Sequence, residues 1–168
     1  AVIGPNADNA FAQLGDWSLG TGQTGGDETH PRESVVSVLD GIKQRFDGEV
    51  LYSPGCSIEA DAAHTVEKID EAVAIAEKAD VVVLVLGDQH HLVGETKSTA
   101  TLELQGGQRE LVEALQKTLQ KTTHKGLQET RQETMHQARQ EIKQQARQQA
   151  GKELIVVLIN SKPLALPK

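Results

Sequence analysis

The chain is poor in aromatic residues and in cysteine. Aromatic side chains make up 2% of the 168 residues, and the whole supply is Phe11, Trp17, Phe46 and Tyr52. Few ring surfaces are therefore available for stacking against a bound ligand. Cys56 is the single cysteine, which excludes an internal disulfide and leaves the cellular compartment undecided.

Basic faces and long hydrophobic runs are also lacking. The net charge is -7, so we expect no nucleic acid partner. The longest apolar runs, 81–86 and 154–159, are far too short to cross a bilayer, so we expect no membrane partner. No Cys–X–X–Cys or His-Glu-X-X-His spacing occurs, and a metal site is not expected.

A glycine motif gives only formal support for a nucleotide cofactor. Gly20-Thr-Gly22-Gln-Thr-Gly25 matches the dinucleotide fingerprint in spacing. It neither follows a strand directly nor opens an apolar helix, as that fingerprint requires. We therefore interpret it as a flexible loop and expect no cofactor.

Strand-like and helix-like patterns alternate along the chain, which has enough apolar content (38%) for one domain core. Strands are expected at 1–4, 49–53, 81–86 and 154–159, and helices at 31–46, 61–78 and within 108–150. Such alternation is typical of parallel strands joined by crossovers. We predict a three-layer α/β sandwich of flavodoxin-like type, with a mostly parallel sheet of about four strands.

The expected helix 31–46 has Pro31 in its first turn, a position that proline tolerates. Its apolar face would consist of Val35, Val36, Val38, Leu39, Ile42 and Phe46.

Residues 118–150 break the alternation, because one crossover helix would be enough here. Gly126 is expected to stop a first helix, and a second weak stripe includes Met135 and Ile142. We expect a protruding helical hairpin or one long bent helix, with Met135 and Ile142 packed on Leu115 or Leu119. The domain would then consist of 1–117 and 151–168, with 118–150 as an inserted helical segment that is either solvated or partner-binding.

The loop after the strand 81–86 gathers Asp88, His90, His91 and Glu95 within eight positions. Ligands of open α/β sheets sit beyond the carboxyl ends of the strands. Glu95, between Gly94 and Thr96, is the leading candidate for proton transfer, and an exposed loop carboxylate without a role is the alternative. If the first strand lies between the second and the third, the loops 5–30 and 87–105 meet. One cleft would then be surrounded by Asp8, Asp16, Trp17, Asp88, His91 and Glu95.

Many separate motifs carry a resemblance to a known family. They are Ala1-Val-Ile-Gly-Pro-Asn-Ala-Asp8, Leu14-Gly-Asp-Trp-Ser18, Tyr52-Ser-Pro-Gly-Cys56, Gly94-Glu95, Gly106-Gly-Gln108 and Val157-Leu-Ile-Asn160. In this order they resemble the C-terminal α/β sandwich domain of glycoside hydrolase family 3, the β-glucosidase and β-xylosidase group. The resemblance covers residues 1–117 and 151–167.

The resemblance implies a retaining mechanism in which Glu95 is the general acid/base. The family's nucleophile is an aspartate on a separate (β/α)8 barrel domain, about 5–5.5 Å from the acid/base. Asp88, His91 and Trp17 would bind the sugar. A β-glycoside would therefore be a substrate only when a barrel domain completes the site, and the chain alone should be inactive.

The competing hypothesis is an engineered or chimeric scaffold without catalysis, whose inserted hairpin mediates assembly. Removing residues 118–150 would restore a short connection of the family's usual kind, which makes the Gln-rich segment look like an addition. The strand 154–159 is expected to leave a sheet edge uncovered, so we also expect a homodimer.

Overall fold

The computed structural model describes residues 1–15, 32–59, 65–129 and 152–166. Its centre is a four-stranded, all-parallel sheet of order β2-β1-β3-β4. The strands are β1 (Val2–Ile3), β2 (Tyr52–Ser53), β3 (Val81–Gly87) and β4 (Glu153–Ile159). The helices are α1 (Ala10–Leu14), α2 (Val38–Arg45), α3 (Thr65–Lys78) and α4 (Gln108–Glu129), with short 3-10 turns η2 (Arg32–Ser34) and η3 (His90–Leu92).

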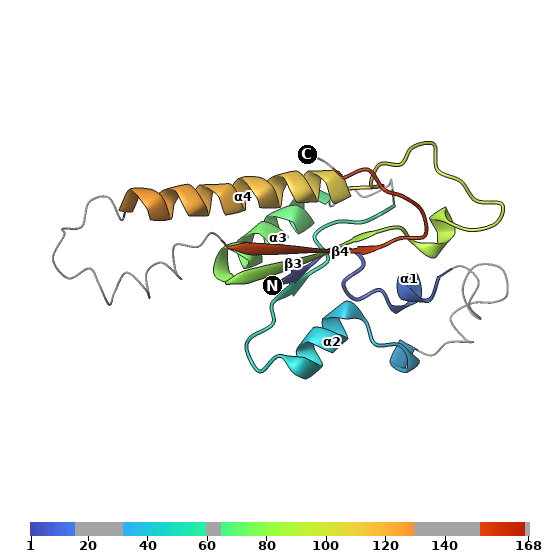
Figure 1. The fold of residues 1–168 in the computed structure, drawn as a ribbon, viewed down its shortest axis with the longest axis horizontal. Coiled ribbons are helices and arrows are strands. Elements are labelled where there is room, and N and C mark those ends of the chain that lie inside the picture. Colours follow the sequence, from blue (N-terminus) through green and yellow to red (C-terminus); the bar gives the residue numbers. More distant parts are fainter. Residues whose placement is uncertain (16–31, 60–64, 130–151, 167–168) are drawn as a thin grey trace.

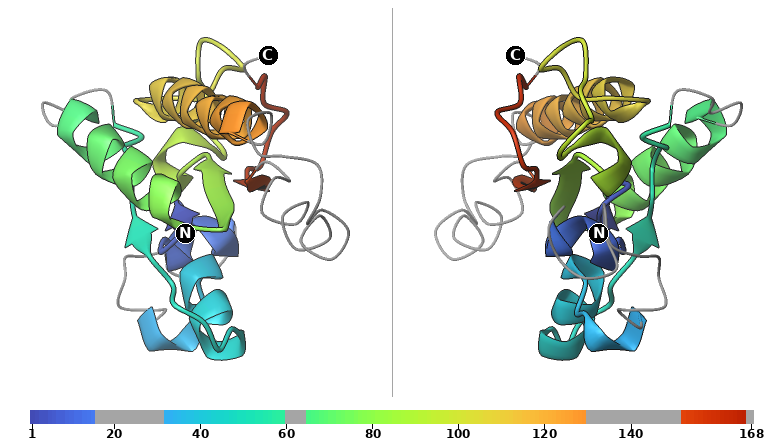
Figure 2. Two further views of the ribbon diagram at one scale, coloured as in Figure 1. Left: turned by 90° about the vertical axis from the view of Figure 1, so that its left-hand side faces the viewer. Right: turned by 90° about the vertical axis from the view of Figure 1, so that its right-hand side faces the viewer.

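The helices form two layers, one on each side of the sheet (Figures 1 and 2). Helices α3 and α4 lie together on one side, and α2 lies on the other. This arrangement confirms the predicted three-layer α/β fold. β1 lies between β2 and β3, which is the condition under which the loops after β1 and β3 leave from neighbouring strands. None of the helices described is long and apolar enough to cross a membrane.

Strand β3 explains why the sheet is covered on both faces. Its successive side chains point to opposite faces, and nearly all of them are aliphatic. Val82, Leu84 and Leu86 are packed in the core beneath α3 and α4, whereas Val85 is packed in the core beneath α2. Each face therefore has its own apolar core, as a central strand of a parallel sheet requires.

Cys56 belongs to the core on the α3 and α4 side, where it is 2% exposed. Burial raises the pKa of its thiol to about 12. The side chain therefore packs as a small apolar group and is not an accessible nucleophile.

The predicted start of the helix at Pro31 is wrong, because α2 begins only at Val38. Ser37 caps it: its Oγ accepts from the Asp40 N–H at 3.1 Å, and the Asp40 carboxylate accepts from the Ser37 N–H at 3.0 Å. This reciprocal capping box ends the preceding turn and sets the helix register. Val36 and Phe46 are consequently 54% and 58% exposed. The prediction that both belong to the buried face of the helix is therefore wrong.

The expected helix stop at Gly126 is also wrong, because α4 continues through this glycine to Glu129. Glycine weakens a helix interior only modestly. The expected packing of Met135 and Ile142 lies outside the described residues, as does most of the inserted segment 118–150. The predicted boundaries between the α/β domain and this inserted segment stay a prediction. Helix α4 runs through the predicted boundary at residue 118 without a break.

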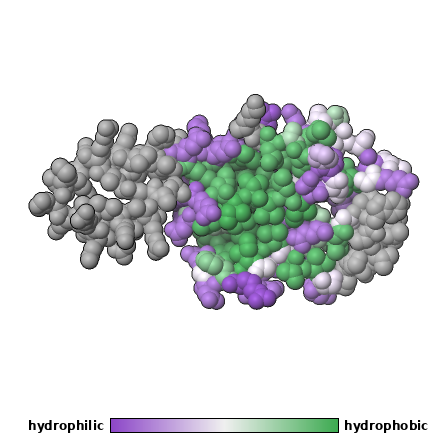
Figure 3. Space-filling view, in the orientation of Figure 1, coloured by the Kyte–Doolittle hydropathy of each residue, from purple (hydrophilic) through white to green (hydrophobic). Residues whose placement is uncertain are grey.

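Strand β4 forms one edge of the sheet and is more exposed than its composition suggests. Ile155, Val156 and Leu158 are each about two-fifths exposed. In Figure 1, β4 lies toward the viewer. Figure 3 shows the same side of the molecule, and a broad apolar region occupies it.

Candidate functional site

Three strand ends meet at the carboxyl edge of the sheet, and their loops converge on Asp88. Asp88 directly follows β3. Asn6, in the loop after β1, donates from Nδ2 to the Asp88 carbonyl oxygen at 2.9 Å. Lys162, in the segment after β4, donates from Nζ to Asp88 Oδ1 at 2.9 Å. The first residue of the candidate catalytic loop is thus held from two neighbouring strands.

The Asp88 carboxylate forms a nearly buried ion pair with Lys162. The two side chains are 3% and 22% exposed, respectively. Asp88 Oδ2 is buried and has no hydrogen-bond partner among the residues that the structure describes, so Lys162 supplies the main compensation for the charge. The sugar contact expected of Asp88 stays a prediction; here the side chain anchors the loop.

The side-chain amide of Gln108 completes the end of β3. Its Oε1 accepts from the Gly87 N–H, and its Nε2 donates to the Gly87 carbonyl, both at 2.9 Å. The same Nε2 also donates to the Gln105 carbonyl at 2.9 Å. Gln108 is completely buried in the first turn of α4, so this helix fixes the point from which the loop departs.

Glu95 is exposed on a tight turn within that loop. The Lys97 N–H donates to the Gly94 carbonyl at 3.2 Å, which places Glu95 and Thr96 at the two central positions. Thr96 has φ +67°, a left-handed conformation that favours glycine and is costly for a β-branched residue. Backbone strain of this kind gathers at functional sites, so the turn that presents Glu95 is unusual in its own right.

His91 and its neighbour His90 form the turn η3 between Asp88 and Glu95. Both are exposed, and their rings lie edge to face with centroids 6.0 Å apart. Lys97 donates from Nζ to the His90 carbonyl at 2.8 Å and ties η3 to the Glu95 turn. Within the described ranges, no group of three His, Cys, Asp or Glu side chains could hold a metal ion.

The predicted cleft is only partly described. Trp17 and Asp16 lie outside the described residues. Asp8 is engaged elsewhere: its Oδ1 contacts Arg32 Nη2 at 2.5 Å and accepts from Ser37 Oγ at 3.0 Å. Its carboxylate therefore fixes η2 and the start of α2.

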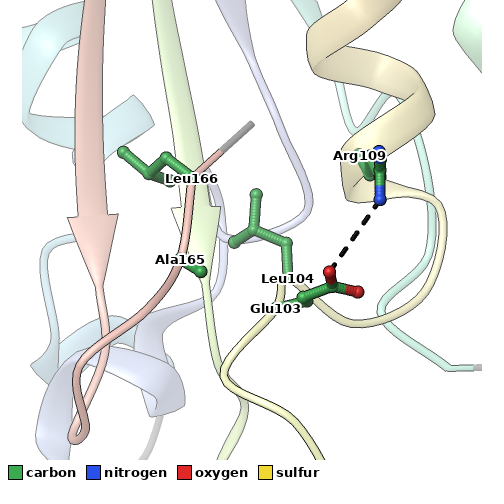
Figure 4. A pocket seen from close by; sticks show the side chains of 5 residues that line it. All are labelled: Glu103, Leu104, Arg109, Ala165 and Leu166. Atoms are coloured by element: carbon green, nitrogen blue, oxygen red, sulfur yellow. Dashed lines mark ion pairs between the residues drawn. The ribbon is translucent and has the colours of Figure 1, made fainter. Parts of the chain in front are cut away.

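A shallow cavity of about 120 Å³ lies at a different place (Figure 4). It is lined by Glu103, Leu104, Arg109, Ala165 and Leu166. The Arg109 guanidinium contacts Glu103 at 3.9 Å and Glu113 at 3.0 Å. The lining includes none of the predicted site residues, and its one cation is already paired with carboxylates, so we do not assign the sugar site to it.

Sequence reasoning overlooked Asn6, Gln108 and Lys162 as parts of this site. Asn6 and Lys162 each follow closely after a strand of the sheet, and that position is the signal that could have identified them. Gln108 carried a weaker signal, a polar residue at the start of an apolar helix. Only the fold shows that its amide reaches Gly87.

The chain is similar to known proteins in both sequence and structure. The profile of the glycosyl hydrolase family 3 C-terminal domain matches residues 1–144. A β-xylosidase of Formosa agariphila is 34% identical over 168 aligned residues, which cover 99% of this chain and 18% of the relative. The periplasmic β-glucosidase of Salmonella typhimurium is 28% identical over 187 aligned residues, covering 100% of this chain and 19% of the relative.

A solved structure gives the same result. A β-glucosidase involved in saponin metabolism from intestinal bacteria matches with a TM-score of 0.73 and 35% identity, covering 99% of this chain and 21% of that one. The chain thus spans about a fifth of the length of these relatives. These comparisons give no support to an engineered or chimeric scaffold.

Proposed function

Because the chain belongs to the C-terminal domain family of glycosyl hydrolase family 3, we propose that it supplies the general acid/base to a retaining β-glucosidase or β-xylosidase. Glu95 is the residue in this role. The substrate class is a β-linked glucoside or xyloside, in line with the names of the similar proteins. A nucleophilic carboxylate comes from a barrel domain.

One observation carries the proposal for Glu95: an exposed carboxylate sits on a strained turn whose base is fixed. Gly87 and Asp88 are held by hydrogen bonds from Gln108, Asn6 and Lys162. A proton donor must stay within hydrogen-bond reach of the leaving oxygen, so a fixed loop base is what this chemistry requires. A loop carboxylate without a role would not need it.

The proposed reaction uses Glu95 twice. Its carboxyl group first donates a proton to the glycosidic oxygen while the nucleophile attacks the anomeric carbon from the opposite face. The resulting carboxylate then takes a proton from water, and the water oxygen attacks the anomeric carbon and releases the nucleophile. The configuration of the anomeric carbon is therefore retained. The exposure of Glu95 suits this exchange, because the side chain must reach both the leaving group and water.

His91 and Trp17 are proposed as sugar-binding residues on the flanking loops. His91 is an exposed donor and acceptor four residues before Glu95. Trp17 belongs to the small aromatic supply of the chain and would stack against an apolar sugar face. Asp88 is proposed to contribute by fixing the loop through Lys162 and, once the barrel is present, by a contact to a sugar hydroxyl.

A domain exchange tests the proposal. This chain would replace the segment to which it aligns in the Formosa agariphila β-xylosidase, and release of nitrophenol from aryl β-xylosides would be measured. We expect an active exchange enzyme. Glu95→Gln should lower turnover by about 10²–10⁴-fold for nitrophenyl xyloside. The loss should be much smaller for a dinitrophenyl xyloside, whose leaving group needs little protonation.

Glu103→Gln is the matched control, because Glu103 is an exposed carboxylate of the same connection with its side chain 63% exposed. Its turnover should equal that of the unmodified exchange enzyme. The proposal would be wrong if Glu95→Gln kept full activity, or if both leaving groups lost activity equally. Retention of configuration in the product, followed by NMR, checks the reaction class.

A further inference from the structure

Lys97 joins two parts of the loop that carries Glu95. Its backbone N–H donates to the Gly94 carbonyl at 3.2 Å and closes the turn on which Glu95 lies. Its side chain reaches back seven residues, where Nζ donates to the His90 carbonyl at 2.8 Å. A single residue therefore closes the Glu95 turn and connects that turn to η3.

The backbone between η3 and the turn does not by itself fix the direction of Glu95. Only Val93, which is 8% exposed, separates η3 from the turn. The turn then begins at Gly94, whose φ is +106°. Glycine adopts this conformation and many others at little cost. The direction of Glu95 relative to η3 therefore depends on a contact that spans the glycine, and the Lys97–His90 hydrogen bond is such a contact.

The turn is also strained at Thr96. Its φ of +67° is the one left-handed value outside glycine among the described residues, and a β-branched side chain disfavours this conformation. Such a conformation persists only where surrounding contacts hold it. Both Lys97 contacts lie directly beside Thr96, so they oppose relaxation of the turn.

The side chain of Lys97 is folded back onto the loop. A lysine side chain normally keeps its charged end in water. Here Lys97 is half-buried, although Gly94, Glu95 and Thr96 before it are exposed. Its ammonium contacts the His90 carbonyl, and a charged donor makes a stronger hydrogen bond than a neutral one. The contact is therefore suited to hold an exposed turn.

We infer that Lys97 is a positioning residue for Glu95. The hydrogen bond from its ammonium to the His90 carbonyl holds the Glu95 turn against η3, so that the carboxyl group is presented to the leaving oxygen in one orientation. The inference rests on the proposed role of Glu95 as general acid/base. Catalysis is sensitive to such placement, because a shift of about 1 Å can lower a rate by about 10²-fold.

Kinetics of the exchange enzyme, in which this chain replaces the matching segment of the Formosa agariphila β-xylosidase, test the inference. Lys97→Met should lower kcat/KM for nitrophenyl xyloside by about 10–100-fold, because the acid is then correctly placed only part of the time. For a dinitrophenyl xyloside, which needs little protonation, kcat/KM should stay close to the parent value. An equal loss for both leaving groups would indicate general structural damage and would overturn the inference.

Two further variants serve as controls. Lys97→Arg keeps a charged donor with enough reach for the His90 carbonyl, so it should retain most of the parent kcat/KM for nitrophenyl xyloside. Lys43→Met removes the same charge at an exposed position of α2 and should match the parent with both substrates. A Lys97→Arg enzyme as impaired as Lys97→Met would contradict the inference.

The pH profile of kcat/KM separates positioning from a direct effect of the lysine charge. Positioning predicts that Lys97→Met keeps the pH limits of the parent and reaches a lower plateau between them. An effect of the charge on proton donation would instead move the upper limit. A moved limit that accounts for the whole loss would overturn the inference.

NMR relaxation of backbone amides in the chain alone gives a test that does not depend on catalysis. The amides of Glu95 and Thr96 should be ordered in the parent and in Lys43→Met, and more mobile on the picosecond-to-nanosecond timescale in Lys97→Met. Equal mobility in the parent and in Lys97→Met would show that the contact does not hold the turn, and the inference would be wrong.

Failure of the inference can be told apart from failure of the proposed function. If Glu95→Gln keeps full activity in the exchange enzyme, the proposed function is wrong and the inference falls with it. If Glu95→Gln is impaired as expected while Lys97→Met equals the parent with both substrates, the inference alone is wrong.

Discussion

The side-chain amide of Gln108 pairs with Gly87 as a strand backbone would, through one accepted and one donated hydrogen bond of 2.9 Å each. The final residue of β3 therefore has a helix side chain as a hydrogen-bonding partner. The candidate catalytic loop begins at the next residue, Asp88. Its geometry thus depends on the docking of α4 against the sheet.

Replacing Gln108 by leucine should destabilise the chain by at least about 2 kcal/mol, because a buried N–H and a buried C=O of Gly87 lose their partner. The midpoint of urea unfolding measures the change. Gln120→Leu is the control, since Gln120 is exposed on the same helix. Similar midpoints for the two variants would show that the Gly87 contacts contribute little.

Gly87→Ala should be among the most damaging single substitutions. A Cβ atom there would lie 1.9 Å from the Ile159 carbonyl oxygen, and the backbone φ is +139°. The opposite sign is expected at Gly41, inside α2, where a Cβ would meet only Val36 at 3.8 Å. Gly41→Ala should stabilise the chain by about 0.5–1 kcal/mol. Thermal unfolding of both variants checks the pair.

Lys162→Met should destabilise the chain by about 2–3 kcal/mol, because it leaves the Asp88 carboxylate buried without its cation. The double variant Asp88→Asn with Lys162→Met removes that charge as well and should recover part of the loss. Lys43→Met, at an exposed position of α2, should change stability by less than about 0.5 kcal/mol. Urea unfolding of the parent, Asp88→Asn, Lys162→Met and the double variant measures the coupling, and additive effects would contradict it.

The contacts of Asp40 predict a change of stability in acid. Hydrogen bonds from the Arg32 guanidinium and from Ser37 lower the pKa of Asp40 from 3.8 to about 2. A carboxylate with a lowered pKa in the folded state contributes stability above its ordinary pKa and loses it as pH falls toward the folded value. The midpoint temperature of unfolding should therefore decrease as the pH is lowered from about 4 to about 2.

Asp40→Asn should make the acid dependence of this midpoint shallower, whereas Asp47→Asn, at an exposed carboxylate just after α2, should keep the parent slope. A direct carbon NMR titration of the Asp40 carboxyl group gives the pKa itself. A value near 3.8 would show that the Arg32 contact is not kept in solution.

The chain by itself should release no nitrophenol from an aryl β-glucoside. Double displacement requires a nucleophile and an acid/base on opposite sides of the sugar, and the proposed site supplies only Glu95. Turnover by the purified chain that disappears in Glu95→Gln would contradict this expectation. The same turnover unaffected by Glu95→Gln would indicate a contaminating glycosidase.

Much of the fold follows from hydrophobic patterns, because β3 is a continuous aliphatic run of the kind found in parallel sheets that are covered on both faces. The expected helix start at Pro31 is wrong, because a proline is compatible with the first turn of a helix but does not by itself specify where the helix begins. The capping box with Asp40 is a stronger signal than a proline in the first turn. The short helix α1, capped by Asn9 through a hydrogen bond to the Ala12 N–H, was missed in a glycine-rich stretch.

The site was less predictable than the fold. Asp88 and His91 were identifiable because they follow a buried strand, and Glu95 because of the family resemblance. Asn6, Gln108 and Lys162 reach the loop base from segments far away in sequence. Such contacts depend on strand order and on side-chain reach, and neither is visible in local periodicity.

The register of β3 with β4 has a consequence for how the chain acquires its structure. Val81 pairs with Glu153, so the longest strand pair of the sheet can close only after β4, far downstream of β3 in the sequence, has been synthesised. Distant pairings of this kind slow folding, since loop entropy is lost before contacts compensate for it. During that interval the apolar strand β3 can pair with β1 but has no partner on the side that β4 later occupies. The nascent chain is therefore most vulnerable to aggregation while β4 is still being synthesised.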